Sequence, residues 1–268
     1  MRQPAVADHF YPGSPEALAR AVNALLPSNN QDVDRQKALA VVLPHAGYVY
    51  SGALAATTLN SVIIPKTVIL IGPNHRGQGG PVALSTATWN MPFGKVEADK
   101  ELCELILQQS LSIKVDELAH RYEHSLEVQL PFLQTLQKEL RIVPLTVSRI
   151  SYALCEEIAG ALARAITLSA RDILIVASSD MNHYESRKNT EHKDRLALQC
   201  IEQLNPERLY HTVIDNRISM CGFIPVVLAL LAAKTQGAGT CRLVGHTDSG
   251  HVSGDTEQVV GYAGVVIG

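Results

Sequence analysis

The chain has 268 residues, 46% hydrophobic and 18% charged, which is enough for one large core. Its formal net charge of −3 and pI near 6.4 provide no basic surface for nucleic acid or an anionic membrane, so a small or neutral partner fits better. No apolar run suits a secretory signal or approaches the roughly 20 residues that span a bilayer. We therefore expect one cytoplasmic domain over residues 1–268.

Short apolar runs, rich in β-branched residues and bounded by turn residues, predict buried strands. They span Ala38 to Leu43, Thr67 to Gly72, Arg141 to Val147, Asp172 to Ala177, Arg242 to Gly245 and Val259 to Ile267. Helical spacing predicts a helix that begins at Ser14 with Pro15 in its first turn, and others at about Asp99 to Gln109, Glu123 to Lys138, Ser151 to Ser169, Arg187 to Leu204 and Cys221 to Lys234. This alternation predicts an α/β fold with a largely parallel or mixed central sheet and helices on both faces.

Four of the ten histidines follow strand-like runs within a few residues: His45, His75, His183 and His251. In open α/β sheets, the loops at the carboxyl ends of parallel strands converge on one ligand-binding crevice. Neutral imidazole suits Zn, Cu, Fe and Ni, and three protein ligands with an open position are usual where a metal does chemistry. Asp180, three residues before His183, could orient an imidazole or accept its proton. Because a single loop histidine is more often structural or solvated, the pattern alone leaves both readings open.

A second candidate pair is His124 and Glu127, which fall one helical turn apart and could both face a cleft. The alternative is an ordinary helix start, where acidic residues favour the positive end of the helix dipole. Tyr48 and Tyr50 could line a substrate pocket or be half-buried aromatics with a polar tip. The five cysteines are odd in number, scattered and without a CxxC pair, which argues against a disulfide framework or a thiolate zinc site.

Several longer motifs occur in the order found in one protein family. They are Pro44-His45-Ala46-Gly47-Tyr48, Gly72-Pro73-Asn74-His75, Glu123-His124-Ser125-Leu126-Glu127, Ser178-Ser179-Asp180-Met181-Asn182-His183, Cys221-Gly222 and Gly261-Tyr262-Ala263. Together they resemble the Memo family, called AmmeMemoRadiSam system protein B in bacteria and archaea, over roughly residues 5 to 268. That family is similar in fold to class III extradiol dioxygenases, non-haem iron enzymes that open catechol rings.

Position by position, the resemblance implies that His45, His75 and His251 are metal ligands, with Asp180 and His183 beside them. His183 matches the place where the dioxygenases hold a general base. Animal members carry a cysteine at one ligand position, where this chain is expected to carry His251, and the dioxygenases carry a carboxylate as third iron ligand. The copper and iron described for the animal members, and ring cleavage itself, are therefore not carried over to this chain.

Beyond these positions, we expect His124 to be a catalytic group and Tyr48, Asn74 and Glu127 to lie in the substrate pocket. The leading hypothesis is a metal-dependent, dioxygenase-like oxidoreductase with Fe(II) as first choice and Zn or Cu as alternatives. Two other functions stay open: a metal-binding scaffold that binds a phosphorylated peptide or a partner, as suggested for animal members, and a zinc hydrolase. The bacterial and archaeal family name implies a functional link to a radical SAM protein and an AMMECR-type protein.

Overall fold

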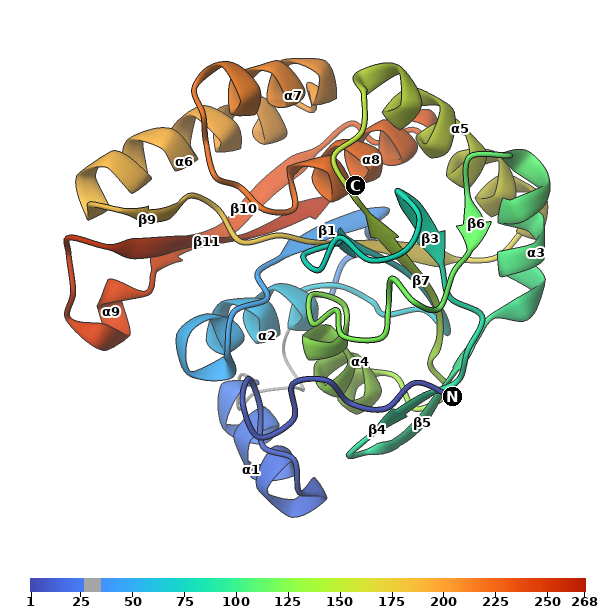
Figure 1. Cartoon of the computed structure of the whole chain (residues 1–268), viewed down its shortest axis with the longest axis horizontal. Helices are drawn as coiled ribbons and strands as arrows, with labels where there is room; N and C mark the ends of the chain where they lie inside the picture. Colours follow the sequence, from blue (N-terminus) through green and yellow to red (C-terminus); the bar gives the residue numbers. More distant parts are fainter. Residues whose placement is uncertain (27–34) are drawn as a thin grey trace.

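A mixed β-sheet runs through the computed structural model, which describes residues 1–26 and 35–268 (Figure 1). Its strands pair in the order β10-β11-β1-β8-β2-β7-β3-β6. The bounds are β1 Ala40–Leu43, β2 Thr67–Pro73, β3 Val82–Leu84, β6 Lys114–Val115, β7 Arg141–Val147, β8 Ile173–Ser178, β10 Cys241–Asp248 and β11 Val259–Ile267. Off this path, β4 (Trp89–Met91) pairs with β5 (Gly94–Ala98), β5 also pairs with β7, and β9 (His183–Glu185) pairs with β11.

The centre of the sheet is parallel and its edges are partly antiparallel. Strands β1, β8, β2 and β7 pair in parallel. Strand β11 is antiparallel to β1, β10 is antiparallel to β11, and β3 is antiparallel to β7. The carboxyl ends of β1, β2 and β8 therefore lie at one edge, where the loops that follow them can meet.

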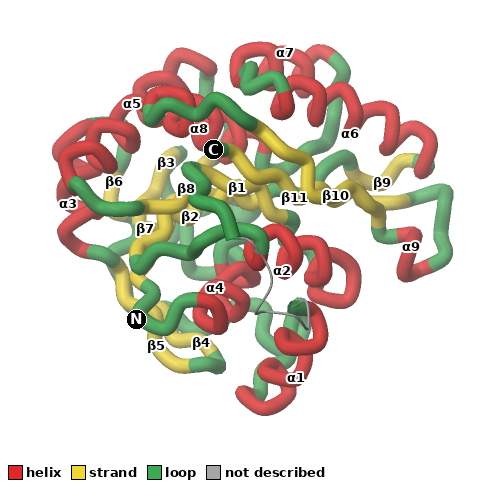
Figure 2. The backbone as a smooth tube through the Cα atoms, turned by 180° about the vertical axis from the view of Figure 1, so that it is seen from behind, coloured by secondary structure: helices red, strands yellow, loops and turns green. Residues whose placement is uncertain are grey.

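Helices cover both faces of this sheet (Figure 2). One layer holds α3 Lys100–Gln109, α5 Tyr152–Ser169, α6 Arg187–Glu202, α7 Pro206–Asp215 and α8 Phe223–Thr235. The other holds α1 Pro15–Leu25, α2 Ala53–Asn60 and α4 Leu130–Leu136. The short turns η1 Tyr48–Gly52, η2 Glu127–Gln129 and α9 Gly250–Ser253 complete the described elements. No helix of the described residues is both long and apolar enough to span a bilayer.

Two hydrophobic cores flank the sheet because successive strand side chains point to opposite faces. In β2, Ile69 and Ile71 pack under the layer with α5 and α8, whereas Val68 and Leu70 pack under α2 and α4. All seven residues of β2 are buried, as expected for a parallel strand covered on both faces. The predicted α/β fold is thus confirmed, and the predicted strands and most helices lie within a few residues of their expected bounds.

The N-terminal caps explain why the helix starts were readable from sequence. Ser14, Asp99 and Ser151 each accept a hydrogen bond from the backbone N–H three residues later, at the starts of α1, α3 and α5. Such a bond satisfies one of the N–H groups that the first turn leaves without a partner. The expected elements do not include α2, α7 or the strands β3, β4, β5, β6 and β9. These strands have two to five residues each and therefore carry little periodic signal.

The helix expected over Glu123 to Lys138 is wrong at its start. Residues 123–126 form a loop, and regular structure begins only with η2 and α4. The Glu123 carboxylate accepts hydrogen bonds from the backbone N–H groups of His124 and Ser125, both at 2.9 Å. A side chain that captures neighbouring backbone donors competes with helix formation, so the loop persists.

Candidate metal centre

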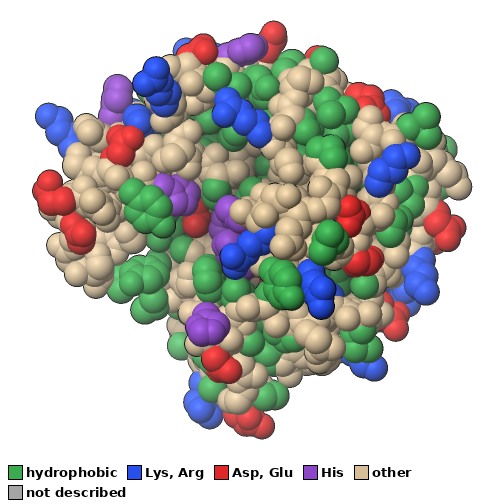
Figure 3. Space-filling model, viewed as in Figure 1, with side chains coloured by type: hydrophobic (Ala, Val, Ile, Leu, Met, Phe, Trp, Pro, Cys, Tyr) green, Lys and Arg blue, Asp and Glu red, His purple; other side chains and the backbone are tan. Residues whose placement is uncertain are grey.

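The loops after β1, β2 and β8 meet in a cleft of about 760 Å³. Histidine side chains gather around a hollow on the face shown in Figure 3, with hydrophobic side chains beside them. The polar groups of the lining include His45, His75, His124, Asp180, His183 and Cys221. The expected convergence of strand-end histidines is therefore seen for three of the four, and the volume falls in the range typical of small-molecule pockets.

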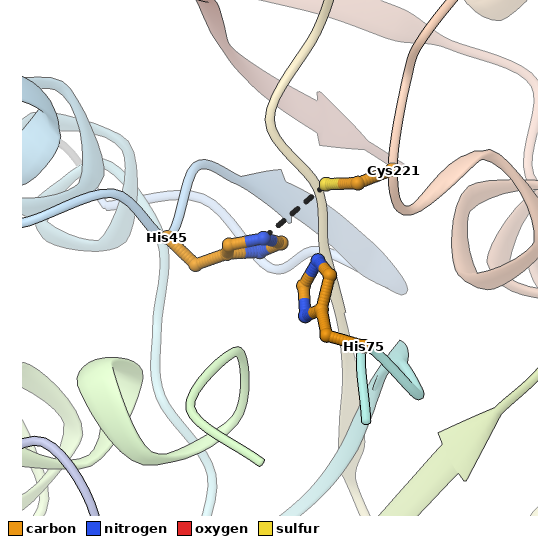
Figure 4. Close-up of side chains that lie close together, drawn as sticks. All are labelled: His45, His75 and Cys221. Carbon is orange, nitrogen blue, oxygen red and sulfur yellow. Dashed lines mark hydrogen bonds between the residues drawn. The ribbon is translucent and has the colours of Figure 1, made fainter. Parts of the chain in front are cut away.

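His45, His75 and Cys221 form a candidate metal-ligand group in this cleft (Figure 4). One donor atom from each lies within 4.8 Å of the other two, and Cys221 Sγ is 3.2 Å from His45 Nε2. The three residues follow β1, follow β2 and precede α8 respectively. Two imidazoles and a thiol at this spacing can bind one ion and leave further coordination positions open to the cleft.

Ser178 fixes the orientation of the His45 ring. Its hydroxyl donates to the Ser125 carbonyl at 2.7 Å, so its oxygen is the acceptor for His45 Nδ1–H at 2.9 Å. This leaves the His45 Nε2 lone pair directed at Cys221 and the cleft. His45 is 2% exposed, and burial, followed by the neighbouring His124 and His75, holds its pKa well below the usual range. The imidazole is therefore neutral, the form that binds a metal.

Glu123 plays the corresponding part for His75. Its Oε1 accepts His75 Nδ1–H at 2.9 Å and its Oε2 accepts the His75 backbone N–H at 2.7 Å. Although burial favours the neutral acid, these bonds and the backbone donors hold the pKa of Glu123 at about 2. Glu123, His75 and His124 also lie close enough to hold an ion. Because Oε1 already accepts three hydrogen bonds and Oε2 accepts the His75 backbone N–H, we assign Glu123 to orienting His75.

The thiol of Cys221 also suits a cation. Its Sγ accepts a hydrogen bond from the Asp180 backbone N–H at 3.3 Å. Burial, followed by the Asp180 carboxylate, raises the pKa of the Cys221 thiol well above its usual range. A metal ion reverses this tendency, since a coordinating thiol loses its proton. The donor set thus fits a soft or borderline divalent ion.

Three predicted catalytic residues lie around this group in the same cleft. Asp180 accepts the His45 backbone N–H at 2.7 Å, and burial raises its pKa to about 6. Burial lowers the pKa of His124 to about 4. His183 Nδ1 is buried without a hydrogen-bond partner among the described residues. A buried imidazole nitrogen without a partner is unusual in folded proteins.

The sequence model described as Memo-like protein matches residues 2–266. The chain belongs to the Memo family. It is 40% identical to a MEMO1 family protein of Aquifex aeolicus, over 99% of this chain and 98% of that protein. It is 38% identical to one of Methanosarcina barkeri over the full length of both chains, and 39% identical to one of Archaeoglobus fulgidus over 99% of each.

A solved structure supports the fold of this Memo-family chain. An uncharacterized protein of Escherichia coli K12, JW3007, superposes with a TM-score of 0.58 over 85% of this chain and 99% of its own. The two share 14% sequence identity. The likeness therefore extends to the fold alone.

His251 does not lie with the other two expected ligands. It lies on α9 with 65% of its side chain exposed, and its Nδ1 is 3.6 Å from Asp248. Asp248 is held by Arg187 and by the backbone N–H of Gly250, which fixes this turn away from the metal-ligand group. Cys221 completes the candidate group instead of His251, so the expected contrast with the cysteine of the animal members is not seen here.

A sequence signal for Cys221 existed in the Cys221-Gly222 pair. A Cβ atom at Gly222 would lie 2.2 Å from the Ser178 carbonyl oxygen, so glycine is required where this loop approaches the end of β8. This close approach brings the Cys221 thiol next to the His45 ring. The number and spacing of the cysteines did not indicate this role for Cys221, because a site with one thiol and two imidazoles does not need a CxxC pair.

The three residues predicted for the substrate pocket lie outside the cleft lining. Tyr48 is buried and donates to the Val128 carbonyl at 2.8 Å, and Asn74 Nδ2 donates to the Gln78 carbonyl at 2.7 Å. Glu127 is fully buried and binds the N-terminal segment, including Tyr11 and Arg2. The lining instead includes Phe10, Tyr50, Tyr184 and Tyr262. Of these, only Tyr50 was weighed from the sequence.

Proposed function

We propose that this Memo-family chain is a metal-dependent oxidoreductase in which His45, His75 and Cys221 hold the ion. The observation that carries the proposal is the convergence of these three donors in a cleft whose lining also includes His183. Imidazole and thiolate donors suit iron and copper, and we take Fe(II) as the first choice. Such an ion would supply the one-electron chemistry that O₂ needs to react with a catechol-like substrate.

In this proposal the chain itself positions the substrate and moves its proton. His183 would accept a proton from a substrate hydroxyl, since its side chain belongs to the lining of the cleft. A general base of this kind typically contributes 10² to 10⁴ in rate. Asp180 would keep the His45 segment in place through the 2.7 Å bond to its backbone N–H.

Metal content tests the proposal first. We would purify the protein anaerobically and measure bound metals by mass spectrometry beside His45→Ala, His75→Ala and Cys221→Ser variants. We expect near-stoichiometric iron in the parent and its loss from each folded variant. The matched control is His251→Ala, which should retain the metal because that side chain lies outside the group. Equal metal loss in His251→Ala would contradict the assignment of ligands.

The turnover experiment follows with the loaded protein. Oxygen consumption would be recorded with catechols for the parent and for His183→Ala. We expect consumption in the parent and a drop of about 10² or more in the variant at unchanged metal content. Full turnover by metal-loaded His183→Ala would refute the proton-transfer role. If the protein bound metal but consumed no oxygen with any catechol, the proposed oxidoreductase activity would be refuted.

A zinc-dependent hydrolase is a second candidate function, because zinc also binds imidazole and thiolate donors. Catalytic zinc sites use three protein ligands that include cysteine and histidine, and the bound water then ionises near neutral pH. The same metal analysis separates the two: zinc as the stoichiometric ion, with no oxygen consumption after iron loading, favours hydrolysis.

A further inference from the structure

The charge of the cleft indicates which ligands it can accept. The residues that line it include the carboxylates Asp180 and Asp255 and the thiol of Cys221. Within the part of the chain that the structure describes, no Lys or Arg belongs to this lining. A phosphate or carboxylate on a ligand would therefore find no fixed cation along the walls, apart from a bound metal that already has an anionic ligand.

The basic side chains nearby are committed elsewhere. Arg187 binds Asp248 through two hydrogen bonds, of 2.8 and 2.9 Å. Lys193 pairs with Glu185. Arg76, which follows His75, lies outside the lining and directs its Nε to the Tyr122 carbonyl at 3.4 Å. A charged ligand in the cleft therefore meets carboxylates before it meets any of these cations.

Aromatic rings form much of the remaining wall. Phe10, Tyr50, Tyr184 and Tyr262 all line the cleft. Tyr50 and Tyr184 are 41% and 72% exposed, so part of each ring is free to contact a ligand. Tyr184 also adopts a left-handed backbone with φ of 57°, which is uncommon for a bulky residue and often marks a functional position. Aromatic faces attract rings and cations alike.

Asp255 is an exposed residue of the cleft lining, and local hydrogen bonds orient its carboxylate. It lies in the β10–β11 connection, residues 249–258, and its Oδ1 accepts the Glu257 backbone N–H at 2.7 Å. The backbone N–H of Arg187 donates to the Thr256 carbonyl at 2.9 Å, which ties this connection to α6. The carboxylate is therefore positioned before any ligand arrives.

We infer that the cleft takes a neutral or cationic aromatic ligand and discriminates against anionic ones, with Asp255 selecting the charge. This inference rests on the proposed function in placing the substrate in the same cleft. It directs the search away from phosphorylated peptides and aryl carboxylates, and toward phenols and catechols that carry an amine.

A matched ligand series tests the inference by calorimetry under anaerobic conditions. Tyramine and 4-hydroxyphenylacetate share a phenol and differ in side-chain charge, and dopamine and 3,4-dihydroxyphenylacetate are the corresponding catechols. We expect each amine to bind about ten-fold more tightly than its acid. Titrations of metal-free and metal-loaded protein separate the contribution of the walls from that of the ion.

Asp255→Asn should reduce the ratio of amine to acid affinity by about three-fold, the size expected for one partly exposed charge pair. The control is Glu257→Gln, which makes the same charge change in the same connection at a residue outside the lining; its ratio should stay near the parent value. Equal binding of amine and acid, or no binding by any member, overturns the inference. Tight amine binding without oxygen consumption leaves the inference standing and overturns the proposed oxidoreductase.

Discussion

Two glutamates four residues apart, Glu123 and Glu127, show how neighbours decide the role of a buried carboxylate. Both are fully buried and both collect several hydrogen bonds. Glu123 binds the ring and backbone of His75. Glu127 binds the backbone N–H groups of Ala5 and Val6 and pairs with Arg2. The first carboxylate orients a candidate metal ligand, and the second attaches the N-terminal segment to the body of the protein.

The largest expected effect is on stability at Glu127. Glu127→Gln would leave the Arg2 guanidinium, whose side chain is 4% exposed, without its carboxylate partner at 2.7 Å. Breaking one side of a buried ion pair typically costs about 3 kcal/mol. We expect the free energy of unfolding, measured with urea, to fall by about this amount. Metal affinity of the folded variant should stay unchanged, and a large loss of affinity would break the distinction between the two glutamates.

Glu123→Gln should give the converse result. A neutral amide cannot accept all the donors that Glu123 now satisfies, so the His75 ring would lose its fixed orientation. Loss of such an orienting carboxylate typically weakens metal binding by about 10- to 100-fold. Competition with a chelator of known affinity would measure this, with Glu127→Gln as the matched buried control. Unchanged affinity would instead favour a purely structural Glu123.

A third buried carboxylate, Asp99, extends the comparison to the opposite edge of the sheet. It caps α3 by accepting the Leu102 backbone N–H, and it binds Thr67 Oγ1 and Arg171. Burial favours its neutral form, but these bonds outweigh burial and hold the pKa of Asp99 below its usual value. Its contribution to stability is therefore present above the unfolded-state pKa, near 4, and is lost as pH falls through the lower folded-state pKa.

Asp99→Asn should consequently lower the free energy of unfolding at pH 7 by about 1 kcal/mol. It should also make the loss of stability below about pH 4 less steep. Urea unfolding across this pH range would measure both effects. Glu101→Gln is the control, because that side chain is 78% exposed and lies 3.8 Å from Arg171. If the free energy of unfolding changed with pH in the same way for the parent and for Asp99→Asn, Asp99 would not titrate as described.

The sequence by itself determined the α/β fold, the capped helix starts and the convergence of three strand-end histidines. These features are local or periodic: Ser14 caps the helix that follows it, and His45 and His75 directly follow strands of one parallel sheet. Only the tertiary structure brought in Cys221 and left His251 in solvent. Likewise, only the fold gave Glu123 and Glu127 different binding partners. Such choices depend on contacts between loops that are far apart in the sequence, and no local pattern indicates which loop reaches the candidate metal centre.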